Sequence, residues 1–282
     1  MVLDFTSLLY VPGNNMHMME KSLSSAATAV IFDLEDAIPI EQKTTARDTI
    51  RKFYEINNGF KSKDHKSIGI RTNAVNTKFF ADDLDLVINI GADFVVIPKW
   101  APDQNGALKN IVLPLIVLIE NYKGLLGIRK VIDIPALIAI GWGAADFALS
   151  VGGDCDFYLW DTKIPIDIVT FAREFNKIPL DCVFFDLKDE IRFTEHLHRG
   201  IEMGFEGKQV IHPDQATLAG RIFKPSLDEY TEAKNIVSIY KQNAINGTGA
   251  MSYNGMMIDK VNYSLSMEII KRYTKNDKEG KK

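Results

Sequence analysis

Short apolar runs rich in β-branched residues alternate with amphipathic stretches along most of the chain. Such runs are typical of buried strands, and their alternation with longer amphipathic segments is typical of parallel βα units. The pattern predicts eight strands, at residues 7–11, 29–35, 67–71, 94–99, 113–120, 136–142, 180–185 and 208–212. Helices are predicted between and after them, at residues 14–26, 41–55, 77–90, 122–132, 144–151, 165–176, 188–203 and 214–221.

Eight strand–helix units within roughly 220 residues favour a closed barrel. An open doubly wound sheet usually has fewer strands and a glycine-rich phosphate turn after its first strand. No G-x-G-x-x-G follows the strand at 7–11. We therefore predict an α/β fold, a (β/α)₈ TIM barrel, that forms a catalytic domain over residues 1–225.

Residues 226–282 follow the eighth unit and form a predicted C-terminal extension. A helix is expected over 226–242, and Asn254-Gly255 predicts the tight turn of a small hairpin before a last short helix. A barrel does not need this segment to close. We therefore expect the extension to pack on a neighbouring subunit.

The composition narrows the class of protein. The chain has 282 residues, 46% of them hydrophobic, and its 33 basic and 37 acidic residues give a net charge of −4. This balance gives no electrostatic footprint for nucleic acid. Two cysteines cannot form a disulfide framework, and the N-terminus lacks a basic segment followed by a long apolar stretch. We expect a cytoplasmic protein without a membrane partner.

Polar residues gather at the carboxyl ends of the predicted strands, where barrel enzymes place their active sites. The second strand ends in "DLED", and strand alternation puts Asp33 and Glu35 on one face, with Asp36 at the start of the loop. Arg71 closes the third strand and is expected to point into the barrel mouth together with Asn73.

Further charges close the next strands. Lys99 ends the fourth strand on the face of Val95 and Ile97, Glu120 ends an otherwise apolar fifth strand, and Asp146 lies in the first turn of the helix after the sixth. Carboxylates beside cations predict oxygen ligands for a hard divalent cation, with an anionic substrate next to it. Mg²⁺ is favoured, whereas zinc would need histidine or thiolate, and neither clusters in the sequence.

Backbone groups are expected to contribute to the same site. Gly141 and Gly143 let a ligand approach the start of the helix at 144–151, so Gly143, Ala144 and Ala145 are candidate substrate-binding residues, as are Asn73 and Lys99. His212 closes the eighth strand and is expected to order the loop that follows rather than to transfer protons.

Three of the acidic residues can also be explained by structural roles that involve no metal or substrate. Glu120 would form a structural ion pair with Arg71. Asp146 would only complement the N-terminal end of its helix, and Asp36 would cap the helix at 41–55. The sequence leaves these alternatives open.

Nine sequence blocks, in order, resemble the citrate lyase beta-subunit-like family, whose stand-alone members include citramalyl-CoA and malyl-CoA lyases. The blocks run from residue 8 to about 260 and read "LLYVPGNN", "VIFDLEDAIPIEQKTTAR", "IGIRTN", "GADFVVIPK", "LIVLIENYKGLLG", "GWGAADF", "GFEGKQVIHPDQ", "KPSLDEYTEA" and "YNGMMID". The resemblance implies a (β/α)₈ barrel, assembled as a homo-oligomer (trimer or hexamer), that binds Mg²⁺ and a 3-hydroxy-acyl thioester of coenzyme A.

The resemblance also implies residue roles. It assigns Glu120 and Asp146 to the metal, and Glu35 to its surroundings through water. Arg71 would bind the oxygens of the keto-acid product. Asp259 in "MMID" would be the acid/base residue, offered to the site of a neighbouring subunit.

Other matched positions lie around this centre. Lys208 and the "VIHP" loop with His212 match a region that lies near coenzyme A in relatives. Asp33 and Asp36 are expected to support the site from outside the metal ligands.

The sequence departs from the family beside the site. Asn121 replaces a small hydroxyl residue, Lys163 stands where relatives commonly carry arginine, and Lys260-Val261 replaces a frequent proline after "MMID". These changes bear on acyl-group preference and thioester recognition more than on the core chemistry.

The implied activity is a Mg²⁺-dependent carbon–carbon lyase. It would cleave or form a 3-hydroxy-acyl thioester such as citramalyl-CoA or malyl-CoA, with acetyl-CoA and a 2-keto acid (pyruvate or glyoxylate) as products. Two alternatives stay open: a malyl-CoA thioesterase, and the beta subunit of a citrate lyase complex that acts on a carrier-protein thioester.

Overall fold

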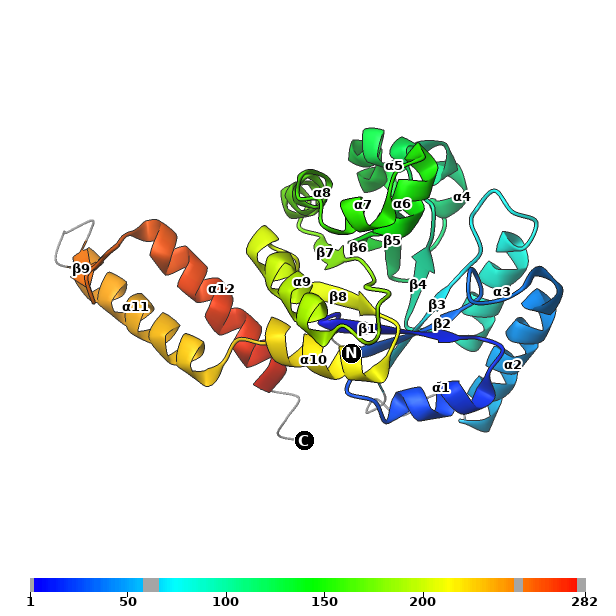
Figure 1. The fold of residues 1–282 in the computed structure, drawn as a ribbon, viewed down its shortest axis with the longest axis horizontal. Coiled ribbons are helices and arrows are strands. Elements are labelled where there is room, and N and C mark those ends of the chain that lie inside the picture. Colours follow the sequence, from blue (N-terminus) through cyan, green and yellow to red (C-terminus); the bar gives the residue numbers. More distant parts are fainter. Residues whose placement is uncertain (1–2, 58–65, 246–250, 278–282) are drawn as a thin grey trace. The chain divides into compact units, whose positions relative to one another are not determined.

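The computed structural model describes residues 3–57, 66–245 and 251–277. The chain divides into two compact units, Met1–Phe223 and Lys224–Lys282. In the first unit, eight parallel strands pair in sequence order and β1 pairs with β8, so the sheet closes into a barrel with helices around it (Figure 1). The predicted (β/α)₈ barrel is confirmed.

The barrel elements follow the order expected from the sequence. The strands are β1 Ser7–Pro12, β2 Ala29–Asp33, β3 Ser67–Arg71, β4 Phe94–Ile97, β5 Leu115–Ile119, β6 Leu137–Trp142, β7 Ile178–Asp181 and β8 Gly207–Val210. The α-helices are α1 Met16–Leu23, α2 Lys43–Ile56, α3 Phe80–Ile90, α4 Asn105–Leu108, α5 Tyr122–Leu126, α6 Ala144–Val151, α7 Cys155–Leu159, α8 Lys163–Glu174, α9 Glu190–Met203 and α10 Pro213–Phe223. Short 3₁₀ helices are η1 Ile40–Gln42, η3 Pro102–Gln104 and η4 Ile128–Asp133.

The seventh strand begins and ends earlier than predicted. The sequence predicts it at 180–185, but β7 ends at Asp181. Beyond that residue Val183 lines a cavity at the barrel mouth, and Phe184 is buried in the apolar layer outside the barrel. The apolar run therefore reflects the packing of a loop, which alternation alone does not distinguish from a strand. The one-turn helices α4 and α7 are also absent from the prediction, because each is too short to establish a period.

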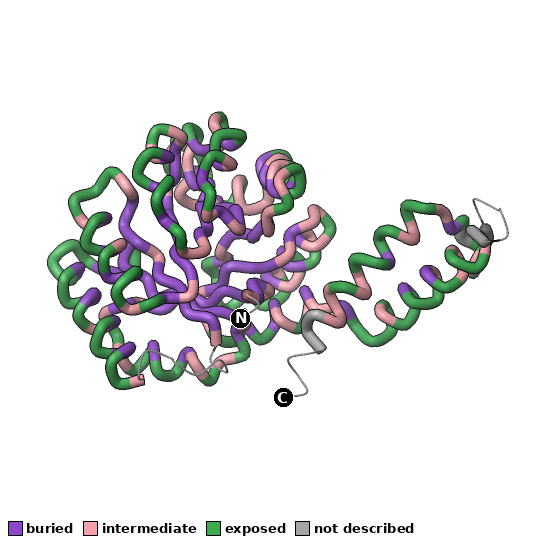
Figure 2. Tube along the Cα trace, turned by 180° about the vertical axis from the view of Figure 1, so that it is seen from behind, coloured by how far each residue is buried: buried purple, intermediate pink, exposed green. Residues whose placement is uncertain are grey.

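Strand alternation divides the apolar residues into two layers. The inner layer fills the barrel and includes Ala29, Ile31, Phe94 and Val96. The outer layer lies between the strands and the helices and includes Val30, Phe32, Val95 and Ile97. Figure 2 shows buried strands at the centre of this unit and exposed residues on the outer sides of its helices. The inner face of β2 therefore leads to Asp33 at the barrel mouth.

The second unit consists of α11 Leu227–Ile245, β9 Met251–Tyr253, β10 Met256–Ile258 and α12 Lys260–Asp277. The helices α11 and α12 contact each other, with Tyr230 and Tyr273 stacked at a centroid distance of 4.2 Å. Asn254 and Gly255 have φ angles of 50° and 79°, the left-handed conformation of a type I′ hairpin turn. The predicted hairpin is confirmed, while its packing on a neighbouring subunit stays a prediction.

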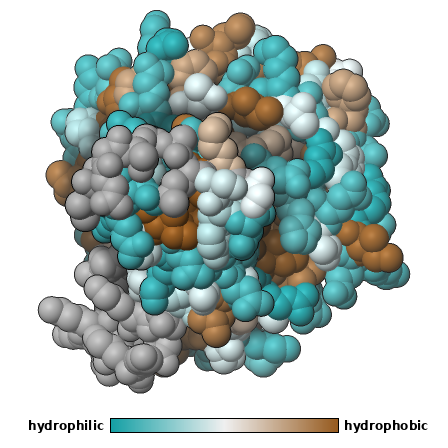
Figure 3. Space-filling model, turned by 90° about the vertical axis from the view of Figure 1, so that its left-hand side faces the viewer, coloured by the Kyte–Doolittle hydropathy of each residue, from teal (hydrophilic) through white to brown (hydrophobic). Residues whose placement is uncertain are grey.

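Hydrophilic side chains predominate on the face in Figure 3, and hydrophobic ones occur there in small separate groups. Scattered exposed apolar side chains are ordinary on a folded protein. Within the described residues, no helix combines the length and apolar character that crossing a membrane requires.

A substitution inside the barrel tests its close packing. A Cβ at Gly69 in β3 would lie 2.1 Å from the Phe94 ring. We expect Gly69→Ala to lower the free energy of unfolding by about 1–3 kcal/mol, because the ring has little room to shift in a closed barrel. In Gly220→Ala on α10, the new Cβ meets nothing within 4 Å, so this control is expected to be neutral or stabilising. Urea denaturation measures both, and equal losses would contradict the packing argument.

Candidate functional site

A cavity of about 400 Å³ opens at the carboxyl ends of the barrel strands. Part of its wall is apolar, and the charged part contains Asp33, Arg71, Glu120 and Asp146. These side chains come from β2, from β3, from the residue after β5 and from the first turn of α6, so elements far apart in sequence place them together. The structure thereby brings together four of the residues predicted from the strand ends.

Arg71 and Asp33 form a two-point ion pair beside the cavity. Arg71 Nε and Nη2 lie 2.7 Å from the two carboxylate oxygens of Asp33. Asp33 is buried and also accepts the backbone N–H groups of Glu35 and Ala37, both at 2.9 Å. Burial alone would raise the pKa of Asp33, but the charge and hydrogen bonds of Arg71 hold it below its usual value. Asp33 therefore fixes both the guanidinium and the turn after β2.

Tyr10 and Gln209 support this pair, and the sequence reasoning missed both. The Tyr10 ring lies 4.8 Å from the Arg71 guanidinium, and its hydroxyl donates to Gln209 Oε1 at 2.8 Å. Gln209 Nε2 in turn donates to the backbone oxygens of Trp142 and Asp181. Alternation along β1 and β8 points both side chains into the barrel. Their polar groups at inward-facing positions of these strands were the feature of the sequence that could have identified them.

Lys99 links the acidic residues of the mouth. Its backbone N–H donates to Glu120 Oε2 at 2.8 Å. Its ammonium lies 2.8 Å from Glu35 Oε1, 3.0 Å from Asp36 Oδ1 and 3.5 Å from Asp146 Oδ1. The residue therefore contacts four carboxylates through two different groups.

The predicted orientation of Lys99 is wrong, although its place at the mouth agrees with expectation. Val95 and Ile97, expected on the same face, belong to the outer apolar layer. The strand β4 ends at Ile97, and Lys99 has a φ of 51°, a left-handed conformation uncommon outside glycine. The chain therefore turns at Lys99, and the strand period no longer decides where its side chain points.

Glu120 is buried against Gly143, with no space between them. A Cβ at Gly143 would lie 2.5 Å from Glu120 Cγ. Burial raises the pKa of Glu120 to about 8, and the neighbouring carboxylates of Glu35 and Asp146 add to the effect. Without a further cation, the ionised form of this carboxylate is disfavoured.

Glu35 lies in a similar environment. Burial raises the pKa of Glu35 to about 7, with Asp36 contributing in the same direction. Its Oε2 atom is buried and forms no hydrogen bond with the described residues, although Arg71 Nη1 is 3.1 Å away. That contact is an ion pair without hydrogen-bond alignment, so the oxygen keeps acceptor capacity.

The donor set fits a divalent cation. Five carboxylates surround two cationic side chains at the mouth: Asp33, Glu35, Asp36, Glu120 and Asp146, with Arg71 and Lys99. A bound cation favours ionised carboxylates and would offset the excess negative charge. Donors that are all oxygen suit Mg²⁺. The predicted metal site is therefore compatible with this geometry.

The structure contradicts two of the purely structural roles considered above, those of Glu120 and Asp36. Glu120 does not hydrogen-bond to Arg71, whose guanidinium binds Asp33 instead. Asp36 does not cap the helix α2, which begins after Gln42; its side chain is half exposed at the mouth.

The helix α6 begins at the cavity, residue for residue as predicted. Gly143 is its N-cap and offers no side-chain cap, and Gly143, Ala144 and Ala145 line the cavity. Helix N-termini favour anions because their first backbone N–H groups lack partners within the helix. Asp146 lies in this first turn and also lines the cavity, so its position fits the helix-dipole interpretation and the predicted metal site alike, and its role as a metal ligand stays a prediction.

Asn73 has a structural partner. Its backbone N–H and its amide nitrogen donate to Asp83 Oδ2 at 2.7 and 2.6 Å. Asp83 also accepts from Arg47 at 2.9 Å. The side chain thus anchors the loop after β3 to α3, and this engagement does not favour the expected contact of Asn73 with substrate.

The two residues expected near coenzyme A differ in exposure. Lys208 is fully buried, with its Nζ 2.7 Å from Asp181 Oδ2 and 2.9 Å from His196 Nδ1. Such an ammonium does not reach a ligand, so a direct contact of Lys208 with coenzyme A does not fit the structure. His212 is partly exposed and its Nδ1 accepts the Asp214 N–H at 3.2 Å, which agrees with a role in ordering its loop.

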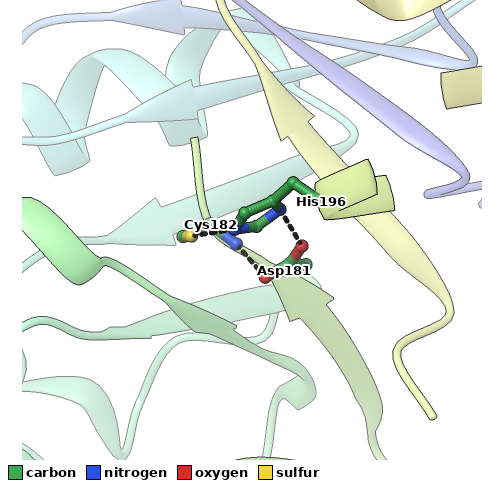
Figure 4. Close-up of side chains that lie close together, drawn as sticks. All are labelled: Asp181, Cys182 and His196. Carbon is green, nitrogen blue, oxygen red and sulfur yellow. Dashed lines mark hydrogen bonds and ion pairs between the residues drawn. The ribbon is translucent and has the colours of Figure 1, made fainter. Parts of the chain in front are cut away.

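Asp181, Cys182 and His196 approach one another closely enough to resemble a metal centre (Figure 4). One histidine and one thiol, 14 residues apart in the sequence, thus come together in the fold and not among the carboxylates of the mouth. However, the Lys208 ammonium binds both Asp181 and His196, and burial raises the pKa of the Cys182 thiol to about 12. We interpret the cluster as a buried ion pair that ties β7, β8 and α9 together.

Asp259 lies in the second unit, at the start of α12. Its Oδ1 accepts the backbone N–H groups of Val261 and Asn262 at 2.8 and 3.1 Å. The Asp259 N–H in turn donates to Asn262 Oδ1 at 3.0 Å. Asp259 therefore caps its helix, and its acid/base role stays a prediction.

Comparison with known proteins places this geometry in context. Residues 6–213 match the family model described as HpcH/HpaI aldolase/citrate lyase. A (3S)-malyl-CoA thioesterase of Cereibacter sphaeroides is 28% identical over 262 residues, covering 91% of this chain and 90% of that protein. An L-malyl-CoA/beta-methylmalyl-CoA lyase of the same species is 29% identical and covers 89% of each chain. A citrate lyase subunit beta-like protein of Deinococcus radiodurans is 28% identical and covers 90% and 92%.

A solved structure shares the fold. The protein CitE from Mycobacterium tuberculosis, in complex with magnesium, acetoacetate and coenzyme A, superposes with a TM-score of 0.81 at 23% identity. The match covers 95% of this chain and 97% of that one.

The raised pKa of Glu120 can be tested in metal-free protein through the pH dependence of its stability. The folded protein holds this proton more tightly than the unfolded chain between the usual value of 4.5 and about 8. The free energy of unfolding is therefore expected to fall as pH rises through that range in EDTA, and Glu120→Gln is expected to flatten the dependence. Thermal unfolding at several pH values measures it. Glu195→Gln, an exposed position on α9, is the control; identical pH dependence in all three proteins would contradict the assignment.

Proposed function

Because the chain belongs to the HpcH/HpaI aldolase/citrate lyase family, we propose that it is a Mg²⁺-dependent carbon–carbon lyase acting on a 3-hydroxy-acyl thioester of coenzyme A. Glu120 and Asp146, which share one cavity with Arg71, are the observation that carries the proposal. The names of the malyl-CoA lyase relative and of the magnesium-bound, coenzyme A-bound neighbour support the metal and substrate class. The products would be acetyl-CoA and a 2-keto acid, pyruvate or glyoxylate.

The metal would be held by the carboxylates of Glu120 and Asp146, with Glu35 acting through water. When bound, Mg²⁺ supplies Lewis-acid chemistry that makes the substrate hydroxyl more acidic. Gly143 supports this arrangement because its lack of a side chain leaves room for the Glu120 carboxylate.

Arg71 would bind the carboxylate end of the substrate and offset negative charge there as the bond breaks. Its plane is fixed by Asp33 on one edge and by the Tyr10 ring on its face. A cation that is oriented before substrate arrives needs no reorganisation during the reaction, which is the condition for effective electrostatic stabilisation. The first turn of α6 at Ala144 and Ala145 would supply backbone donors to the same anion.

Asp259 would be the acid that protonates the departing thioester enolate carbon, or the base in the condensation direction. We propose that a neighbouring subunit provides it, in a homo-oligomer such as a trimer. The free cysteines Cys155 and Cys182 agree with a cytoplasmic, reducing location.

A thioesterase is the second candidate, because a relative of similar identity carries that name. The same site would then direct water onto the thioester carbonyl. A third candidate activity is the cleavage of a carrier-protein thioester within a citrate lyase complex. The name of the citrate lyase subunit beta-like relative supports this candidate.

An assay of the pure protein with Mg²⁺ separates these activities. We expect citramalyl-CoA or malyl-CoA to release a keto acid together with acetyl-CoA, whereas a thioesterase releases free CoA thiol. Keto acid and thiol are scored separately, with citryl-CoA included in the panel. Glu120→Ala and Asp146→Asn are expected to abolish turnover, and full activity of Glu120→Ala in EDTA would refute the metal proposal.

The origin of Asp259 can be tested by mixing inactive variants. Asp259→Asn is expected to lower kcat by about 10²–10⁴-fold while Mg²⁺ binding persists. If one subunit supplies Asp259 to the site of another, co-expression of Asp259→Asn with Glu120→Ala is expected to restore measurable turnover. Mixed assemblies that stay inactive would place Asp259 in the site of its own chain.

A further inference from the structure

Lys99 contacts both proposed metal ligands through separate groups. Its backbone N–H donates to Glu120 at 2.8 Å, and its ammonium lies 3.5 Å from Asp146. Among the residues that the structure describes, no other cationic side chain forms an ion pair with Asp146. The ammonium also lies at 2.8 and 3.0 Å from Glu35 and Asp36, so its charge is shared by the acidic side chains around the metal ligands.

The two cations of the mouth differ in their freedom to move. The Arg71 side chain is 12% exposed and is bound at two points by Asp33. The Lys99 side chain is 35% exposed and holds its partners through one rotatable ammonium. Arg71 is therefore a fixed part of the site, while the Lys99 ammonium can withdraw toward solvent.

The backbone of Lys99 does not have to follow that movement. The left-handed turn at Lys99 aims its N–H at Glu120 independently of the side chain. Withdrawal of the ammonium would therefore leave Glu120 in position and free the oxygen of Asp146, together with those of Glu35 and Asp36. The backbone contact of Lys99 and the contacts of its ammonium are therefore separable. Only the ammonium opposes the binding of a metal.

We infer that the Lys99 ammonium is a built-in competitor of the divalent cation. It neutralises Asp146, Glu35 and Asp36 in the metal-free protein and releases Asp146 when the metal binds. This inference rests on the proposed metal site and adds a residue that lowers its affinity. Like charges at such short range repel, and removal of the ammonium also leaves the carboxylates without their counter-ion. Loss of this side chain therefore strengthens metal binding, the opposite of losing a ligand.

Metal titration of the full-length protein tests the inference without measuring activity. Mg²⁺ binding is followed by calorimetry and Mn²⁺ binding by electron paramagnetic resonance. Lys99→Met and Lys99→Asn are expected to bind both metals about tenfold tighter or more than the wild-type protein. The asparagine variant is included because asparagine tolerates left-handed backbone, and Lys99→Arg, which keeps the charge, is expected to stay close to wild type.

Lys123→Met is the matched control. Lys123 lines the neighbouring cleft with Lys99, Glu120 and Asp146, and it forms no ion pair with the described residues. Its loss removes one positive charge nearby but is expected to change affinity by no more than about twofold. An equal gain in this variant would show a general charge effect and overturn the inference.

The outcomes separate the inference from the function it rests on. Unchanged or weaker metal binding in both Lys99→Met and Lys99→Asn, while wild type binds, overturns the competitor role alone. A wild-type protein that binds neither metal overturns the proposed metal site itself and the competitor role with it. Thermal unfolding in EDTA confirms that each variant is folded before titration.

Discussion

Repulsion among carboxylates held at one end of a closed barrel is the constraint that organises this protein. A barrel with a filled apolar interior cannot let these side chains retreat inward, so the charge has to be balanced at the mouth. Asp33 is balanced by Arg71, and Glu35 with Asp36 by Lys99. Glu120 accepts a backbone hydrogen bond from Lys99 and forms no ion pair with the described residues, and burial together with the carboxylates of Glu35 and Asp146 raises its pKa. The place where balance is incomplete is where the metal is proposed.

Alternation along a strand predicts a residue's direction only where the strand continues to that residue. Asp33 and Arg71 are the last residues of β2 and β3, and both point where their period requires. Glu120 follows directly on β5, Asp146 lies in the first turn of α6, and both reach the same cavity. The barrel and the acidic mouth were accessible from the sequence for this reason.

The remaining features depend on geometry that a local pattern does not contain. The left-handed backbone conformation of Lys99 itself changes the direction of its side chain. The strand β7 ends before an apolar run that belongs to a loop. The contacts of Asn73 with Asp83 and of Lys208 with His196 join elements whose approach only the closed barrel defines. Asn73 and Lys208 could each have formed hydrogen bonds with several other residues. The packing of the folded chain determines which partner each one contacts.

The buried Lys208 bears on how the barrel assembles. Its strand, β8, closes the ring by pairing with both β7 and β1. An ammonium that leaves water without a carboxylate costs several kcal/mol, so a ring that closes before Asp181 is in place would carry that cost. Ring closure is therefore favourable only when β7, β8 and α9 dock together. The last strand of the barrel along the chain carries the charge that makes partial rings unfavourable.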